Sequence, residues 1–234
     1  MSSASRPRIV ALLPMKANSE RVRGKNFRDF NGKPLFRWIL DTLLADEEID
    51  EVIINTDARH ILAENGLVDG PRVRIRDRKP EICGDFVSMN LVLADDVANV
   101  PADIYVMTHT TNPNLSLASV RGAVDLYRRC VADGSGDSVF TVNKFQTRFY
   151  RADGSAINHD PANLIRTQDL EPWFEENSNL YVFSAQSFAA TNARIGRHPK
   201  MYEMGRSESV DIDDQESWFM AEAMSKYLQT GTSS

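Results

Sequence analysis

The chain has 234 residues, enough for one domain with a sizeable hydrophobic core but not for two. Its 42% hydrophobic and 26% charged residues are typical of a soluble globular protein, and no apolar run approaches the roughly 18 residues of a membrane span. A net charge of −6 argues against general nucleic-acid binding. The first residues lack the apolar stretch of a signal peptide, and Cys83 and Cys130 lack any metal spacing, so we expect free thiols, no membrane contact and a cytoplasmic location.

Positive charge is concentrated at the beginning of the chain. Residues 1–40 contain nine Lys and Arg against two acids, a net charge of +7 that leaves −13 for the remainder. The continuous apolar run at residues 8–13 predicts a central strand that is buried on both faces. A basic loop directly after such a strand, at residues 14–26, suits a polyanionic ligand such as a nucleoside triphosphate. A solvated basic loop is the alternative that charge alone leaves open.

Strands and helices are then predicted to alternate. The predicted strands are residues 51–57, 72–76, 103–107 and 137–142, and the predicted helices begin at Pro34, near Ala58, at Phe86 and at Ser116. Pro34 suits the first position of its helix. Asp57 and Asp85 stand just before two of these helices, which favours N-terminal capping roles, although Asp85 could face a ligand as well.

The predicted alternation of strands and helices ends after residue 142. A hairpin is predicted to turn at Asp153-Gly154, and the polar stretch that follows, to about residue 172, has no clear periodicity. Residues 175–183 then return to a core strand. This order predicts a Rossmann-like three-layer α/β/α sandwich, a single domain over residues 1–234, with a small β-rich insertion at about 144–178.

The end of the chain is acidic. Residues 203–222 contain seven acids and one Arg. In Asp211-Ile212-Asp213 a strand period would send both carboxylates to one side and the isoleucine to the other, and hard oxygen ligands of this kind suit Mg²⁺. A closing helix at 216–227 follows. We expect its buried face to consist of Phe219, Ala223 and Tyr227.

The basic loop fits neither common phosphate-binding signature, because a Walker A motif and a Gly-x-Gly-x-x-Gly fingerprint are both absent. It resembles the loop of the acylneuraminate (CMP-sialic acid) cytidylyltransferase family and the related CMP-Kdo synthetases. The residues that fit the sialic-acid form are Lys16, Asn18, Ser19, Lys25 and Asn26. Those that fit the Kdo form are Ser19, Arg21, Gly24 and Lys25. The chain departs from the sialic-acid pattern at Lys16, where an Arg is usual, and at Glu20, where a Lys is usual.

Later segments carry further motifs of the same family. Asp85 and Ser88 match residues that the family places near the cytosine base and its ribose. Thr111 matches the loop at the floor of the active site, whereas His109 stands where the family has Gln. His109 is therefore a candidate contact to the ligand, with a structural histidine as the alternative. The Kdo branch places a metal-binding Asp in this loop, and none is present here.

The resemblance also implies an acceptor site. Asn177 and Tyr181 align with a segment that serves the sugar, but Glu175 and Glu176 do not match it, and their role is left open. The family builds its dimer contact in the inserted arm, which reaches the partner's active site. Arg166 in this arm is the candidate for a substrate carboxylate, because a guanidinium can bind one bidentately. A solvated Arg is the alternative.

The family carries Ser-(Ile/Val)-Asp-Ile-Asp near its C-terminal end, with both Asp residues as metal ligands, so the resemblance implies that Asp211 and Asp213 hold Mg²⁺. The implied fold is of the nucleotide-diphospho-sugar transferase type. The implied reaction transfers CMP from CTP to the anomeric hydroxyl of a sialic-acid-like (ulosonic) sugar and releases pyrophosphate. Lys25, Lys16 and Arg21 would hold the phosphates and stabilise the departing pyrophosphate.

Three alternatives remain at this level: a nucleotidyltransferase for a different sugar or alcohol, a non-catalytic nucleotide-binding relative, and a nucleotide-sugar glycosyltransferase. The partners expected are CTP, a small sugar acid and a second copy of the chain. No general base is visible, and the sequence does not identify the sugar.

Overall fold

A computed structural model describes residues 6–19 and 22–231. Its main sheet has seven strands in the order β5-β4-β1-β6-β8-β7-β9. All of them run parallel except β8, which is antiparallel to both of its neighbours. The strands are β1 (Ile9–Leu12), β4 (Glu51–Thr56), β5 (Val73–Asp77), β6 (Ile104–Thr108), β7 (Ser138–Phe145), β8 (Trp173–Phe183) and β9 (Pro199–Glu203).

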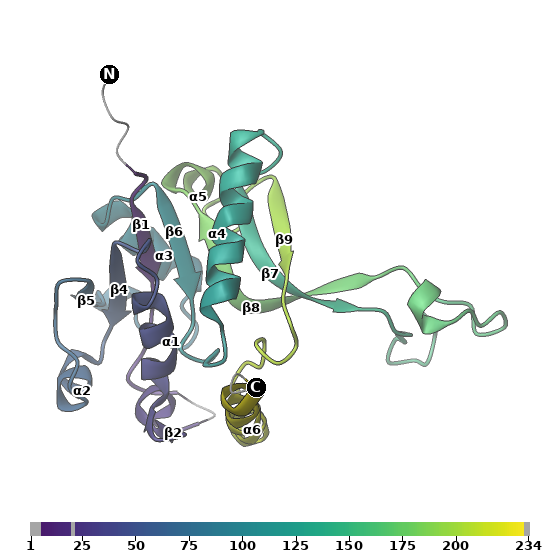
Figure 1. Cartoon of the computed structure of the whole chain (residues 1–234), viewed down its shortest axis with the longest axis horizontal. Coiled ribbons are helices and arrows are strands. Elements are labelled where there is room, and N and C mark those ends of the chain that lie inside the picture. Colours follow the sequence, from purple (N-terminus) through teal and green to yellow (C-terminus); the bar gives the residue numbers. More distant parts are fainter. Residues whose placement is uncertain (1–5, 20–21, 232–234) are drawn as a thin grey trace.

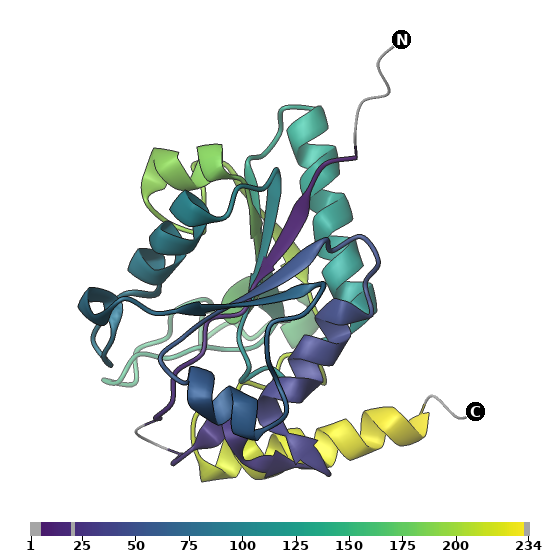
Figure 2. The ribbon, with the colours of Figure 1, turned by 90° about the vertical axis from the view of Figure 1, so that its left-hand side faces the viewer.

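Helices cover both faces of this sheet, as Figure 2 shows. One face carries α1 (Leu35–Leu44), α2 (Arg59–Glu64) and α4 (Leu117–Ala132), and the other carries α3 (Met89–Asn99) and α5 (Ala185–Thr191). The predicted three-layer α/β/α sandwich is therefore confirmed. The strands predicted at 8–13, 51–57, 72–76 and 103–107 all form within a residue or two of their expected bounds.

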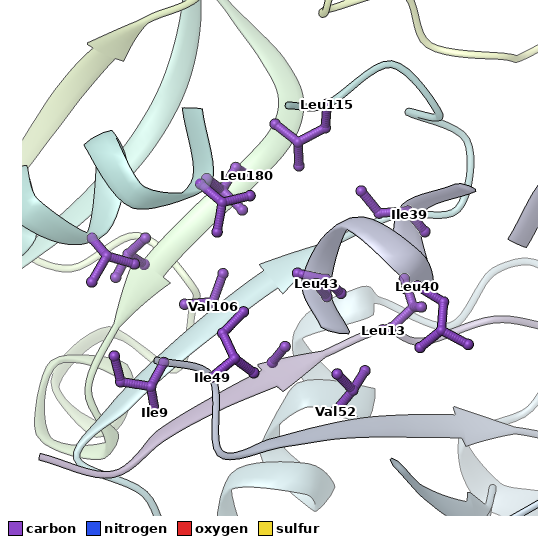
Figure 3. Packing of buried hydrophobic residues seen from close by; sticks show 14 of the residues in the cluster. Ile9, Leu13, Ile39, Leu40, Leu43, Ile49, Val52, Val106, Leu115 and Leu180 are labelled. Atoms are coloured by element: carbon purple, nitrogen blue, oxygen red, sulfur yellow. The ribbon is translucent and has the colours of Figure 1, made fainter. Parts of the chain in front are cut away.

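The core explains why the first strand has no polar position. Ile9 and Ala11 face the cluster under α1 and α4, whereas Val10 and Leu12 face the cluster under α3 and α5. All four are essentially inaccessible to water. The first cluster continues through α1, where Ile39, Leu40 and Leu43 lie over β1 and β4 (Figure 3). Burial of both faces fixes β1 at the centre of the sheet.

A hairpin that the sequence analysis did not predict precedes α1. Its strands β2 (Asp29–Phe30) and β3 (Lys33–Pro34) turn at Asn31 and Gly32, with φ of 52° and 94°. Asn-Gly tolerates such angles and favours this type of turn. Pro34 consequently lies in extended conformation at the N-cap of α1, one residue before the helical position that we predicted.

The closing helix α6 (Gln215–Gly231) packs on this hairpin, and the face predicted for it is wrong. Trp218 and Ala221 are buried, with the Trp218 ring 5.5 Å from that of Phe30. Phe219 and Tyr227 are 60% and 68% exposed. The reason is that α6 lies against β2–β3 at the foot of the molecule and not on the sheet (Figure 1), so the residues facing Phe30 are the buried ones.

The outer halves of β7 and β8 leave the sheet together and carry residues 146–172 away from the body of the protein (Figure 1). We call these two half-strands and the residues between them, 142–176 in all, the arm. It is paired from Val142 with Glu176 to Phe145 with Trp173, beyond a shift in register after Phe140. The predicted hairpin is present as an isolated bridge between Tyr150 and Ala156.

Two predicted helix caps are wrong. Helix α2 has Ala58 at its N-cap, and Asp57 instead accepts a hydrogen bond from the backbone of Ala17. Helix α3 starts at Met89, with Ser88 and not Asp85 as its cap. Both aspartates therefore belong to the loops at the carboxyl edge of the sheet. No helix formed by residues 6–19 and 22–231 is long and apolar enough to cross a membrane.

Candidate functional site

A pocket of about 260 Å³ opens where β1, β5 and β6 give way to their loops. From β1 the chain moves to β4 on one side of the sheet and later to β6 on the other, so the pocket lies at the point where the strand order reverses. Open α/β sheets bind ligands in this crevice, beyond the carboxyl ends of the strands. The lining includes seven of the predicted site residues: Lys16, Ser19, Lys25, Asn26, Asp85, His109 and Thr111.

The basic loop is held in place by buried polar contacts. Asn26 is 7% exposed and donates to the carbonyl of Lys16 at 2.8 Å, while it accepts from the hydroxyl of Thr110 at 2.6 Å. Asp57 accepts from the amide of Ala17 at 2.7 Å. These bonds tie the loop to the ends of β4 and β6, so its lysines stand on a fixed backbone.

Lys25 joins the basic loop to the acidic segment near the end of the chain. Its Nζ donates to the carbonyl of Ile212 at 2.5 Å, and the amide of Ile212 donates to the carbonyl of Thr111 at 2.9 Å. Ile212 is fully buried beside Phe30 and Trp218. The segment does not form the strand that its sequence pattern suggested, and the apolar anchor in its middle sets the positions of the carboxylates on either side.

Asp211 has the features of a cation ligand. Its Oδ1 is buried and has no hydrogen-bond partner among the described residues. Burial raises the pKa of this carboxyl above its ordinary value, with Asp213 adding to the effect, while Thr111 and Lys25 oppose it. The part of the chain that the structure describes contains no group of three metal-ligating side chains. Two carboxylates nonetheless suit Mg²⁺, which commonly completes its shell with water and substrate phosphates.

The mouth of the pocket is spanned by an ion pair between Lys16 and Asp85. Both side chains are more than a third exposed, so an incoming phosphate can compete for the lysine at small cost. Ser88 lies just outside the pocket as the cap of α3. Asn18 is exposed on the basic loop and does not line the pocket, and Arg21 and Glu20 lie outside the described residues.

His109 lines the pocket floor as a neutral ring. Withdrawal from water, together with the positive charges of Arg194 and Lys25, lowers its pKa to about 3. Nη1 of Arg194 lies 3.3 Å from Nε2 of His109. Because a guanidinium can only donate, Nε2 is the accepting nitrogen and Nδ1 carries the proton.

Arg78 lines the pocket wall, and the sequence analysis assigned it no role. Its guanidinium donates to the carbonyls of Met15 and Asn55 and to the Asn55 side chain. Burial lowers the pKa of Arg78 below its ordinary value, but arginine stays charged at neutral pH. It therefore adds a fixed positive charge to this wall of the pocket. The signal was its position directly after a predicted strand.

Three predicted acceptor residues do not line the pocket. Asn177 is buried where β7 and β8 shift register, bonded to Thr141 and Asn143. Tyr181 is buried under the guanidinium of Arg194. Arg166 lies on the arm, 72% exposed at its side chain, and pairs with Asp169 through two bonds of 2.7 and 3.0 Å. The roles predicted for these residues remain predictions.

A crevice at the switch point of a Rossmann-like sheet, lined by lysines and bordered by two aspartates, defines a nucleotide-binding α/β protein. The sequence profile of one family, described as cytidylyltransferase, matches residues 10–229. The chain belongs to this cytidylyltransferase family.

Two relatives illustrate the spread of the family. N-acylneuraminate cytidylyltransferase of Oncorhynchus mykiss is 26% identical over 94% of this chain, which spans only about half (51%) of the relative. CMP-N,N'-diacetyllegionaminic acid synthase of Legionella pneumophila is 26% identical over 95% of this chain and 98% of the relative. Among solved structures, CMP:2-keto-3-deoxy-manno-octonic acid synthetase complexed with CTP superposes with a TM-score of 0.67 at 15% identity, covering 94% of this chain and 99% of that one. This likeness confirms the fold.

Proposed function

We propose that this protein transfers CMP from CTP to the anomeric hydroxyl of an ulosonic acid and releases pyrophosphate. The observation that carries the proposal is the bond between Lys25 and Ile212, which places the basic loop and the acidic segment at one pocket. Membership in the family and the names of its relatives support a CTP-dependent reaction with a sugar acid. The need for CTP supports a cytoplasmic location.

In this reaction the sugar oxygen attacks the α-phosphorus in line. The bond from the α-phosphorus to the bridging oxygen breaks, its electrons leave with pyrophosphate, and the hydroxyl proton passes to solvent. Positioning and charge neutralisation dominate such transfers. Lys16 and Lys25 bind the phosphates, and Lys25 stabilises the charge that develops on the departing pyrophosphate. His109 is neutral, and because its Nε2 already accepts from Arg194, it offers the Nδ1–H donor and adds no charge. Arg21 is assigned to the phosphates from its place in the loop.

Asp211 and Asp213 are the residues that would hold Mg²⁺. An ion bound there would supply charge neutralisation at the phosphates and would favour loss of the proton from the sugar hydroxyl. The buried Oδ1 of Asp211, which lacks a hydrogen-bond partner among residues 6–19 and 22–231, supports this assignment.

We assign dimer formation to the arm. Several of its apolar side chains are exposed in the single chain: Tyr150, Ile157, Leu164, Ile165, Trp173 and Phe174. Apolar surface of this kind on a projecting hairpin favours contact with a second copy. Sedimentation velocity of Leu164→Arg should show monomers where the wild type shows dimers. Val68→Arg, equally exposed but remote from the arm, is the matched control.

The test of function is pyrophosphate release from CTP and Mg²⁺ with four acids chosen from the names of relatives: an N-acylneuraminic acid (the N-acetyl form), N,N'-diacetyllegionaminic, pseudaminic and 3-deoxy-manno-octulosonic acid. One acid should be turned over, and EDTA should abolish the reaction. UTP, ATP and GTP serve as nucleotide controls. Pyrophosphate release that requires an acceptor without a carboxylate would show that the acceptor is another alcohol and not an ulosonic acid.

A further inference from the structure

Arg194 occupies an unusual position between the pocket and its surroundings. It lies in the segment between α5 and β9, and its side chain is 19% exposed. The guanidinium lies 3.8 Å from the ring centroid of Tyr181 and donates to His109 at 3.3 Å. Stacking on one side and a bond to the pocket floor on the other hold the planar group in one orientation.

The charge of Arg194 is poorly matched within the chain. Among the described residues its acidic partner is Glu176, at 3.6 Å from Nη2, a distance too long for a hydrogen bond. The Oε1 atom of Glu176 that faces Arg194 already accepts from the hydroxyl of Tyr181. An arginine that is largely withdrawn from water and has only this distant, shared carboxylate gains from a further anion.

A second cavity, of about 370 Å³, lies at Arg194. Its walls come from the start of α3, from Glu176 and from residues 193–195. Met89 lines both this cavity and the nucleotide pocket, and the contact between Arg194 and His109 joins the two. The first turn of α3 adds the positive end of a helix dipole to the same space. An acceptor that reaches the nucleotide pocket from here passes Arg194.

We infer that Arg194 binds the carboxylate of the acceptor, in the cavity beside the nucleotide pocket. This inference rests on the proposed function and names the residue that selects an acid over a neutral sugar. A fixed guanidinium can offer two parallel N–H donors to a carboxylate, which gives direction as well as charge. Glu176 and Tyr181 keep the fork oriented, and Glu176 repels an anion placed on the wrong side of it.

Arg166 is the competing candidate, because the resemblance implies an arm that reaches the partner's site; within one chain the geometry favours Arg194. Asp169 already occupies Arg166 through two hydrogen bonds on the exposed arm, and Arg166 lines neither cavity of this chain. Arg194 is in direct contact with a pocket residue and has no hydrogen-bonded carboxylate among the described residues. A third arginine, Arg197, lies three residues further on, is exposed, and donates to the carbonyl of Ala190. It is a matched control.

The experiment compares steady-state kinetics of Arg194→Met, Arg194→Lys, Arg166→Met and Arg197→Met with the acid that the wild type uses best and with its methyl ester. Met keeps an unbranched apolar side chain beside Tyr181 and removes the guanidinium that lies over its ring. In Arg194→Met the KM for the acid should rise about 10- to 100-fold, as expected for loss of a charged hydrogen bond. The KM for CTP should change less than twofold, and the wild-type preference for acid over ester should disappear. Arg194→Lys should recover part of this preference for the acid.

Three results would overturn the inference. The first is an unchanged KM for the acid in Arg194→Met, and the second is an equal rise for acid and ester, which would mean that Arg194 only supports the fold. The third is loss of the preference in Arg166→Met or Arg197→Met instead. The proposed function is judged separately, by the wild type: if it turns over none of the four acids, both proposals fail, whereas turnover by the wild type together with any of these three results removes only the role of Arg194.

Discussion

The two halves of the proposed site, one for the nucleotide and one for the acceptor, are built differently. The nucleotide half consists of loops that follow directly after β1, β5 and β6, braced by buried hydrogen bonds such as those of Asn26. The acceptor half is assembled from α3, β8 and the segment before β9, and its charged side chains are held mainly by stacking and long contacts. The difference indicates a rigid nucleotide half braced by buried hydrogen bonds, beside an acceptor half in which stacking on Tyr181 and one bond to His109 orient Arg194.

Lys25→Met should cause the largest loss in the rigid half. The kcat should fall about 100- to 1,000-fold, because the lysine stabilises charge that develops on the leaving group. Product release should be followed by a coupled pyrophosphate assay. Lys33→Met is the control, since Lys33 belongs to the same basic segment but lies on the hairpin, over Trp38 and beside Asp41. Equal losses in both variants would mean that bulk charge, and not position, drives catalysis.

Asp96 is buried beneath the nucleotide half and makes the stability of the folded protein depend on pH. It accepts from Asn55 at 2.8 Å and from Arg76, and Asn55 in turn accepts from Arg78 in the pocket wall. Burial raises the pKa of Asp96 to about 6, against the opposing effects of Asn55 and Arg76. The folded state therefore keeps a proton that the unfolded chain loses near pH 4. The stability contributed by this proton is complete below about pH 4 and is lost as the pH rises to about 6.

The difference in the free energy of unfolding between the wild type and Asp96→Asn should accordingly change by about 3 kcal/mol between pH 4 and pH 7. The change favours the variant at the higher pH. Urea unfolding across this range measures it. Two stability curves that stay parallel would show that Asp96 is ionised throughout in the folded protein.

Asn26→Ala should destabilise the protein by about 1 to 3 kcal/mol, because it leaves the Thr110 hydroxyl and the Lys16 carbonyl without their partner. Its KM for CTP should rise as the loop loosens. Asn99→Ala, at the exposed end of α3, should change stability by about 0.5 kcal/mol or less. An Asn26 variant as stable as wild type would mean that the loop does not depend on this brace.

His109→Gln should have the smallest effect, a change in kcat/KM of less than about threefold. Glutamine offers the same neutral acceptor to Arg194, and a ring with a pKa of about 3 does not titrate near neutral pH. The activity profile from pH 5.5 to 8.5 should keep its shape. A lost acidic limb in the variant would identify His109 as a base and contradict its neutral role.

The same contrast explains what the sequence could predict. The fold and much of the lining of the nucleotide pocket were predictable, because the lining residues stand in loops at the ends of strands that periodicity identifies. The buried face of α6 was not, because the partner of Trp218 is a hairpin whose two-residue strands leave no periodic signal. Arg194 carried no signal at all. Its importance comes from residues 85 and 18 positions earlier, His109 and Glu176, which only the folded chain brings to it.

The proposed reaction is tested most directly by ³¹P NMR with CTP, Mg²⁺ and each of the four acids in turn. One acid should yield a phosphodiester signal from a CMP-sugar and an equal amount of pyrophosphate, and Lys25→Met should yield neither at a comparable rate. CTP that remains unconsumed with all four acids, or is consumed to CMP and pyrophosphate without a sugar phosphodiester, would contradict the proposed reaction.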